Sequence, residues 1–231
     1  MKIWKQFKMN LKLLIRLKND FLSRDLFRFS KESKKDIVFD YAINISQEIK
    51  PSQTFENKLY NISSVSEKIN KHIIYPNQIF AFFNIIGNPN RNFRKSRTLV
   101  NGKLIEEKGG GMCQVSGIVY QLSLMAGLEI LERHNHSVDI YDEETRFAPL
   151  GTDATIVYGY KDLRIKNNFP FPIKFRIEIK NNLIYLTLHS VKMIEKKELF
   201  FESKMDQNFI QVNVLNSERK VLNQSKYKKM I

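Results

Sequence analysis

The only cysteine of the chain, Cys113, follows three consecutive glycines and begins a stretch in which apolar residues recur at helical spacing. Glycine adopts backbone conformations that other residues resist, so Gly109, Gly110 and Gly111 can turn sharply and let a ligand approach the main chain. Unpaired N–H groups and the positive end of the dipole at a helix start favour a thiolate, which is the reactive form of cysteine. The sequence therefore predicts a nucleophilic thiol at Cys113.

Histidine and carboxylate side chains follow this cysteine in an order that suits thiol catalysis. His134 and His136 come at the end of a predicted strand, and Asp153 lies on a later segment. A thiolate nucleophile, an imidazole base and an orienting group form the arrangement of papain-like and transglutaminase-like enzymes. We expect the backbone N–H of Cys113 to contribute to an oxyanion hole, with the Gln114 amide as a further donor.

Two other interpretations of these residues stay open at this point. A lone cysteine is often a small buried hydrophobe, and the two histidines could be structural. A zinc ion could be bound by Cys113, His134, His136 and one carboxylate, because the His-x-His spacing puts both rings on one face of a strand. The chain offers only one sulfur ligand and has no CxxC or HExxH motif, so we predict neither a metal nor another cofactor.

The pattern of helices and strands expected around these residues indicates an α+β fold. Apolar residues at helical spacing predict helices over 59–74 and 112–126, and residues 36–49 are weakly helical. We expect an antiparallel sheet from the second half of the chain, with both stronger helices packed on it and the cysteine at the N-terminus of one. Alternating apolar residues predict strands at 128–133, 154–160, 173–179 and 183–189, and an Asn-Gly turn predicts a small hairpin over 99–105.

Charge divides the chain into three predicted parts. Residues 1–35 hold 11 Lys/Arg against 3 Asp/Glu, residues 36–190 hold 18 against 16, and residues 191–231 hold 9 against 5, for a net charge of +14. We interpret them as a basic amphipathic segment, a central domain, and a basic extension with a hairpin around 209–222. A nucleic-acid-binding domain carries its basic excess in the folded part, so the near-neutral centre argues against a nucleic-acid partner. The single cysteine excludes an intramolecular disulfide.

Residues 1–29 place six apolar side chains on one helical face, with lysine and arginine between them: Ile3, Phe7, Leu11, Leu14, Leu17 and Phe21. Such a helix lies on an anionic membrane, or it packs on the core of its own protein, and the sequence leaves both interpretations open. The chain has neither the apolar core of a secretory signal nor an apolar run of about 20 residues. We therefore expect a cytoplasmic or peripheral membrane protein.

Three blocks of the sequence resemble the VanW family, which is named for an accessory protein of glycopeptide-resistance gene clusters. They are residues 75–87 (YPNQIFAFFNIIG), 109–137 (GGGMCQVSGIVYQLSLMAGLEILERHNHS) and 151–173 (GTDATIVYGYKDLRIKNNFPFPI). Some extracellular relatives are implicated in L,D-transpeptidation of peptidoglycan through the cysteine of the GGGxCQ motif. The resemblance thus implies a cysteine-dependent acyl transferase or hydrolase that acts on a stem peptide or its precursor.

The resemblance also implies roles for individual residues. Cys113 matches the motif cysteine, His136 matches the histidine before Ser137 and is preferred as the base, and His134 is the alternative base. Asp153 matches the aspartate of GxDAT. The expected substrate contacts are Gly109, Gly110, Gly111, Gln114 and Ser137. The alternative function is a non-catalytic accessory or peptide-binding protein, in which the cysteine is only packed.

Overall fold

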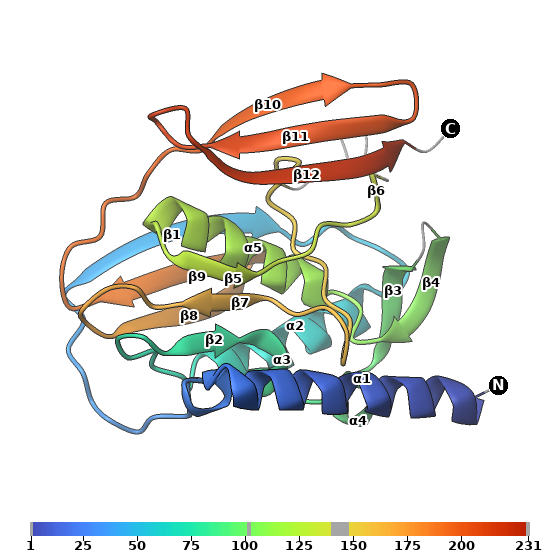
Figure 1. Ribbon diagram of the computed structural model, residues 1–231, viewed down its shortest axis with the longest axis horizontal. Coiled ribbons are helices and arrows are strands. Elements are labelled where there is room, and N and C mark those ends of the chain that lie inside the picture. Colours follow the sequence, from blue (N-terminus) through green and yellow to red (C-terminus); the bar gives the residue numbers. More distant parts are fainter. Residues whose placement is uncertain (1, 101–102, 140–147, 230–231) are drawn as a thin grey trace.

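The computed structural model describes residues 2–100, 103–139 and 148–229 and has an α+β architecture with antiparallel sheets and few helices (Figure 1). One sheet contains β1 (Tyr41–Glu48), β9 (Leu183–Ser190) and β8 (Ile173–Lys180), in that order and antiparallel. The hairpin predicted over 173–189 is confirmed as β8 and β9. Its turn uses Asn181 and Asn182 at φ 52° and 59°, a left-handed conformation that asparagine tolerates better than most residues.

The two longer helices of the central part are α2 (Phe55–Ile69) and α5 (Met112–Ala126). The prediction for α5 is confirmed at both ends, and its C-cap is Gly127 at φ 74°. The helix predicted over 59–74 was only partly right, because α2 begins at Phe55 and the chain leaves it before Ile74, which pairs with Ile173. Side chains of both helices and of this sheet form one hydrophobic core, which includes Ile62, Val65, Ile118, Phe175 and Leu186.

A second sheet carries the residues that precede the predicted histidines. It contains β2 (Ile79–Ala81), β7 (Arg164–Lys166) and β5 (Glu129–Glu132), again antiparallel. The short helices α3 (Phe82–Ile86) and α4 (Pro89–Asn92) follow β2. The predicted small hairpin is present as β3 (Lys95–Val100) and β4 (Lys103–Lys108), while its Asn-Gly turn at 101–102 lies outside the described residues.

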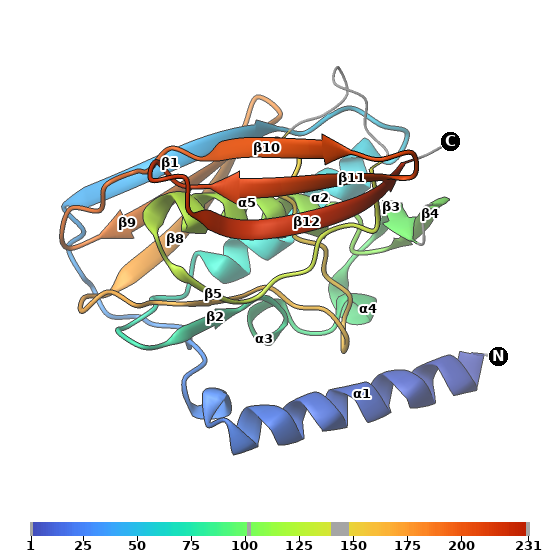
Figure 2. The ribbon, with the colours of Figure 1, turned by 45° about the horizontal axis from the view of Figure 1, so that its top comes forward.

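The C-terminal strands form a further sheet that lies beside α5 (Figure 1 and Figure 2). The hairpin predicted around 209–222 is present as β11 (Phe209–Leu215) and β12 (Val221–Lys229), and β10 (Phe200–Met205) extends it. The short β6 (Val138–Asp139) pairs with β12 in parallel. Val214 of β11 belongs to the main core. The C-terminal sheet is therefore packed on the rest of the protein through apolar side chains.

Two predicted elements were wrong. Residues 36–49 are not helical: they contain β1, which pairs along its whole length with β9, so pairing overrides a weak helical signal. Residues 154–160 do not form a strand of the sheet. They bend back in a turn in which Tyr160 N donates to Val157 O, with Gly159 at φ 77°.

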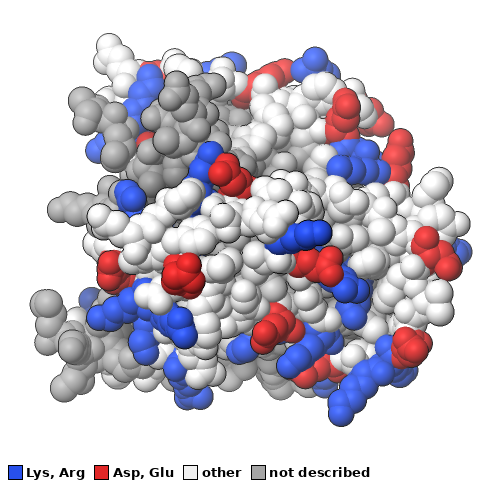
Figure 3. All heavy atoms as spheres, turned by 180° about the vertical axis from the view of Figure 1, so that it is seen from behind, with Lys and Arg blue, Asp and Glu red and all other residues white. Residues whose placement is uncertain are grey.

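The N-terminal helix α1 (Lys2–Leu22), followed by the turn η1 (Asp25–Phe27), runs along the outside of the body (Figure 2). Within the described residues, the structure contains no helix that combines the length and the apolar character needed to cross a membrane. On the face seen from behind the view of Figure 1, basic and acidic side chains are interspersed among uncharged ones (Figure 3).

Candidate active site

The glycine run, residues 109–111, joins β4 to α5 and packs closely against other segments of the chain. Gly109 and Gly111 have φ 88° and 98°, in the left-handed region. Gly110 has no positive φ but packs on β3: an added Cβ would lie 2.6 Å from the carbonyl oxygen of Ser96. Asn61 of α2 donates to the Gly110 carbonyl at 3.0 Å. The run thus fixes the start of α5 against β3 and α2.

This packing predicts opposite outcomes for two alanine substitutions. Gly110→Ala should lower the free energy of unfolding by about 1–3 kcal/mol, because the new methyl group meets a backbone atom that cannot rotate away. Gly117→Ala, inside α5, should raise it by about 0.5–1 kcal/mol, since its Cβ would meet atoms no closer than 3.7 Å. Urea unfolding followed by circular dichroism measures both, and equal effects would contradict the described fit of Gly110.

Cys113 lies in the first turn of α5 and is half-buried. Its Sγ is 4.0 Å from Thr155 Oγ1, and the backbone N–H of Ile156 also interacts with it. Met112 N donates to Gly109 O and Gln114 N to Gly111 O. In the described part of the chain, no backbone carbonyl accepts the N–H of Cys113 itself.

The structure brings His136 and Asp153 together beside this thiol. His136 Nδ1 and its backbone N both lie 2.7 Å from Asp153 Oδ2. This contact occupies Nδ1. Cys113 and His136 lie close enough to shift each other's pKa, the thiol downward and the imidazole upward. Cys113, His136 and Asp153 therefore lie in one cluster, while the catalytic roles expected for them from the sequence stay predictions.

Two residues that the sequence analysis did not identify hold Asp153 from the other side. Arg133 donates to Asp153 Oδ1 at 2.9 Å and to its carbonyl oxygen at 2.7 Å, and Tyr227 donates to Oδ1 at 2.5 Å. Arg133 also reaches Gly151 O and Ser225 Oγ, at 3.1 and 2.6 Å. Tyr227 and Ser225 belong to β12, so the C-terminal sheet completes the surroundings of the aspartate. In the sequence, the position of Arg133 at the end of the predicted strand 128–133, directly before the His-x-His segment, was the only local signal.

The loop from His134 to Ser137 is also attached to β12. Asn135 Nδ2 donates to Lys226 O at 2.8 Å, and Lys228 N donates to Ser137 O at 2.9 Å. Together with the parallel pairing of β6, these bonds fix the backbone on both sides of His136. The position of the imidazole therefore depends on the C-terminal sheet.

The charges of this cluster favour a thiolate–imidazolium pair. Burial raises the pKa of Cys113, but hydrogen bonding and the charge of His136 outweigh it and lower the pKa below 9.0. Burial lowers the pKa of His136, but Asp153 and Cys113 raise it to about 10. Burial raises the pKa of Asp153, while its hydrogen bond to His136 and the charge of Arg133 lower it to about 2. These shifts favour the ionised forms, a thiolate and an imidazolium beside the Asp153 carboxylate.

These directions predict a pH dependence of stability. His136, whose pKa is raised, stabilises the fold below pH 6.5 and loses that contribution as the pH rises through about 10. Cys113, whose pKa is lowered, stabilises the fold above pH 9.0 and loses that contribution as the pH falls through its pKa in the folded protein. Between the folded pKa of Cys113, or pH 6.5 if that is higher, and pH 9.0, the folded and unfolded pair each hold one proton, so the stabilisation by the pair is constant there.

The difference in unfolding free energy between the wild type and Cys113→Ser should therefore be largest just below pH 9.0. It should shrink as the pH falls through the folded pKa of Cys113 and as the pH rises through about 10. Serine keeps the size of the side chain but does not ionise in this range. Urea unfolding at a series of pH values between about 4 and about 10 measures the difference. A difference that does not change with pH would mean that Cys113 and His136 are both neutral.

The other predicted site residues lie in different surroundings. His134 Nε2 is 3.0 Å from Glu132 Oε1, in a group of charges that contacts α1. Gln114 is buried and donates to the Glu48 carbonyl of β1 at 2.7 Å. Ser137 is exposed. Their proposed contacts with a substrate stay predictions. Among the described residues, no group of three His, Cys, Asp or Glu side chains is suited to a metal ion.

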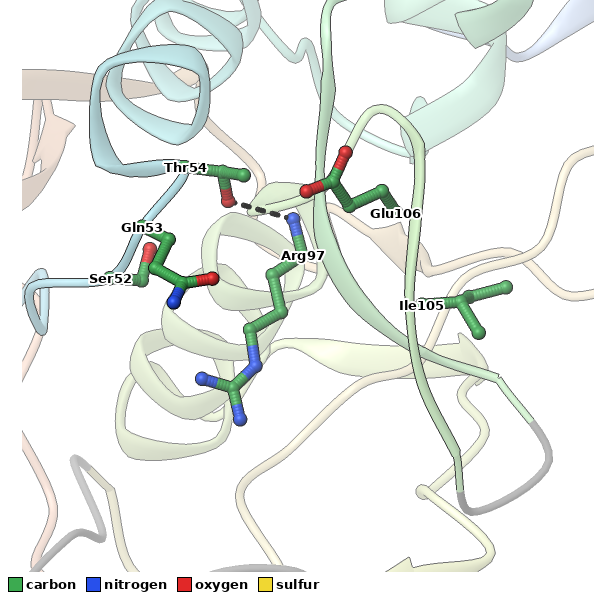
Figure 4. Close-up of a pocket in the computed structure, with 6 residues that line it drawn as sticks. All are labelled: Ser52, Gln53, Thr54, Arg97, Ile105 and Glu106. Atoms are coloured by element: carbon green, nitrogen blue, oxygen red, sulfur yellow. Dashed lines mark hydrogen bonds between the residues drawn. The ribbon is translucent and has the colours of Figure 1, made fainter.

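A pocket of about 590 Å³ lies between the β3–β4 hairpin and the segment before α2 (Figure 4). Its lining residues are Ser52, Gln53, Thr54, Arg97, Ile105 and Glu106. It does not include the Cys113 cluster, but Thr54 Oγ1 is 3.1 Å from Ser96 Oγ, on the residue against which Gly110 packs. The pocket is therefore close to the glycine run, with Ser96 between them.

The fold and the cluster define an α+β protein with a Cys-His-Asp site at the start of a helix. The family model of VanW-like proteins matches residues 57–189. YoaR of Bacillus subtilis, an uncharacterized protein, is 31% identical over 144 residues, which cover 62% of this chain and 46% of YoaR. The vancomycin B-type resistance protein VanW of Enterococcus faecalis is 32% identical over 115 residues, which cover 49% of this chain and 42% of that protein.

The chain belongs to the VanW family. It spans less than half the length of these two curated relatives. A comparison with the solved structures found no match. The family match ends before β12, so Ser225 and Tyr227 lie outside it.

Proposed function

We propose that this protein is a cysteine-dependent acyl transferase or hydrolase that acts on peptidoglycan peptides. The observation that carries the proposal is the cluster of Cys113, His136 and Asp153. A thiol whose pKa is lowered by a neighbouring imidazole, with that imidazole oriented by a carboxylate, is the arrangement of thiol acyl-transfer enzymes. The antiparallel sheets and α5, which carries the cysteine in its first turn, serve as the scaffold.

In the proposed reaction the Cys113 thiolate attacks the carbonyl carbon between an L- and a D-centre of a stem peptide. A C–S bond forms, and the carbonyl oxygen becomes an oxyanion that accepts the backbone N–H of Cys113. The C–N bond then breaks, and the imidazolium of His136 gives its proton to the leaving amine. The product of this half-reaction is an acyl-thioester on Cys113 and a neutral His136.

The second half-reaction regenerates the enzyme. An acceptor amine, or water in the hydrolytic version, attacks the thioester while His136 takes its proton. The C–S bond breaks and restores the thiolate beside an imidazolium. Asp153 does not take up the proton in either half-reaction, because its pKa of about 2 keeps it ionised throughout. Its role is to hold His136 in the orientation that both transfers need.

The identity of the substrate rests on the family. Relatives implicated in L,D-transpeptidation of peptidoglycan use the cysteine that matches Cys113, and one relative of this chain is named a vancomycin resistance protein. The alternative is an accessory protein that binds a peptide without reacting. The pocket beside the glycine run would suit that role too, since it does not include the thiol.

The test incubates the purified protein with muropeptides and analyses protein and products by mass spectrometry. The wild type should form an acyl adduct and cross-linked or trimmed peptides, whereas Cys113→Ala should form neither. The chain has a single cysteine, so any thioester that forms maps to Cys113. If the wild type and Cys113→Ala both leave the peptides unchanged, the proposed activity on this substrate is wrong; binding without turnover by both would favour the accessory role.

A further inference from the structure

The N-terminal helix α1 is attached to the body mainly through charged side chains. Arg16 donates to both carboxylate oxygens of Glu132, at 3.0 and 2.6 Å. Arg164 of β7 donates to both oxygens of Asp20, at 2.5 and 2.8 Å. Paired bonds of this kind fix the orientation of the two partners as well as their distance. The helix is therefore held in one rotational setting.

The docked face also has a small apolar part. Leu13 and Met9 lie over Gly159, whose added Cβ would be 3.1 and 3.4 Å from their Cγ atoms. Arg16 and Asp20 continue the same face, because positions three and four apart share one side of a helix. A mainly ionic side of α1 thus faces the protein.

The opposite side of α1 is apolar and exposed. The side chains of Trp4, Phe7, Leu11, Leu14 and Ile15 are between 48% and 63% exposed. Figure 2 shows α1 on the outside of the body, without another element on its outer side. A contiguous exposed apolar face of this kind marks a surface that meets a partner or a membrane.

The charges around this face favour an anionic lipid surface over a second protein. Lys8 and Lys18 are exposed on the helix, and residues 1–35 have an excess of eight positive charges. Two copies of so basic a segment repel each other, whereas anionic lipid headgroups attract it. A helix of 21 residues is about 30 Å long, but its regularly spaced lysines suit a position in the interface rather than across the bilayer.

We propose that α1 is an interfacial anchor, whose outer apolar face lies in the surface of an anionic lipid bilayer while its ionic face holds the body. The contacts with Glu132 and Arg164 then set the orientation of the body on the membrane. The inference is independent of the proposed catalysis, because it rests on α1 and its contacts alone.

The test measures binding to vesicles of phosphatidylcholine with about 30% phosphatidylglycerol, and to vesicles of phosphatidylcholine alone. Trp4 is the only tryptophan in the chain, so its emission reports directly on the outer face of α1. The full chain should sediment with the anionic vesicles and show a blue shift of emission, with at least about tenfold weaker binding to neutral vesicles. Raising the salt concentration should weaken the electrostatic part of the binding.

The variant Leu11→Gln/Leu14→Gln should bind the anionic vesicles at least about tenfold more weakly, since two apolar side chains lose their burial in lipid. Val38→Gln/Met193→Gln is the matched control: both residues are exposed apolar side chains elsewhere on the protein, and binding should not change. Equal binding by the two double variants, or no binding by the wild type, would overturn the proposal. If the wild type instead dimerises without lipid, and Leu11→Gln/Leu14→Gln abolishes the dimer, the outer face of α1 binds a second copy of the chain and the proposal is wrong.

Discussion

His136→Gln should slow the alkylation of Cys113 by iodoacetamide at a pH of about 6.5 by about a hundredfold. Burial alone raises the pKa of the thiol, and the interaction with His136 is the main effect that lowers it. Without the imidazolium, the thiolate fraction falls about tenfold for each unit by which the pKa rises. Thiols paired with histidine commonly lie about two or more units below free cysteine, which gives the expected size of the effect.

The control is the neighbouring histidine. His134 bonds to Glu132, so His134→Gln should leave the alkylation rate within about twofold of the wild type. The full rate profile from about pH 5 to about pH 10 separates the two variants, because only His136→Gln should shift its midpoint upward. A shift in His134→Gln of the same size would mean that the two rings share the role, and no shift in His136→Gln would mean that the thiol is not activated.

Arg133→Met should lower the free energy of unfolding by about 3 kcal/mol. The Arg133 side chain is only 5% exposed, and it connects Asp153, Gly151 and Ser225. Removing one partner of a buried ion pair costs about 3–5 kcal/mol, and we expect the lower end because the Asp153 side chain is 24% exposed. For a chain of this size the melting temperature should fall by about 6–12 °C.

Two further variants identify the cause of that loss. Arg176→Met removes an exposed arginine that pairs with Glu178, and it should cost less than about 0.5 kcal/mol. Adding Asp153→Asn to Arg133→Met should cost less stability than Asp153→Asn costs in the wild type, since the Arg133–Asp153 ion pair is already lost. If the double variant is instead less stable than Arg133→Met by the full effect of Asp153→Asn alone, the two side chains do not interact.

The sequence predicted most of the elements whose signal is local. α5 has a continuous apolar pattern between Gly111 and Gly127, so both of its ends were correct. β8 and β9 alternate around a short polar turn and pair with each other. β1 was missed because its partner, β9, lies about 140 residues later, and because few of its side chains are buried. The turn at 157–161 depends on Gly159, which no apolar pattern reveals.

The candidate site, too, could be predicted only in part, because some of its contacts join residues that are distant in the sequence. The order of Cys113, the two histidines and Asp153 suggested a thiol site, but the spacing alone left both histidines open, and only the family resemblance preferred His136 over His134. The strand β5 ends at Glu132, so the side chains of His134 and His136 do not follow the alternation of a strand. Arg133 and Tyr227 were missed because their partners lie up to 92 residues away in the chain.

During synthesis, the thiol of the cluster emerges from the ribosome well before the strand that completes its surroundings. Tyr227 follows Cys113 by 114 positions, which at about 5–20 residues per second corresponds to roughly 6–23 s of translation. Contacts between distant segments also form late in folding, because the intervening loop must close first. The nascent chain therefore carries Cys113 as an ordinary thiol, and the environment that lowers its pKa is complete only after β12 has docked.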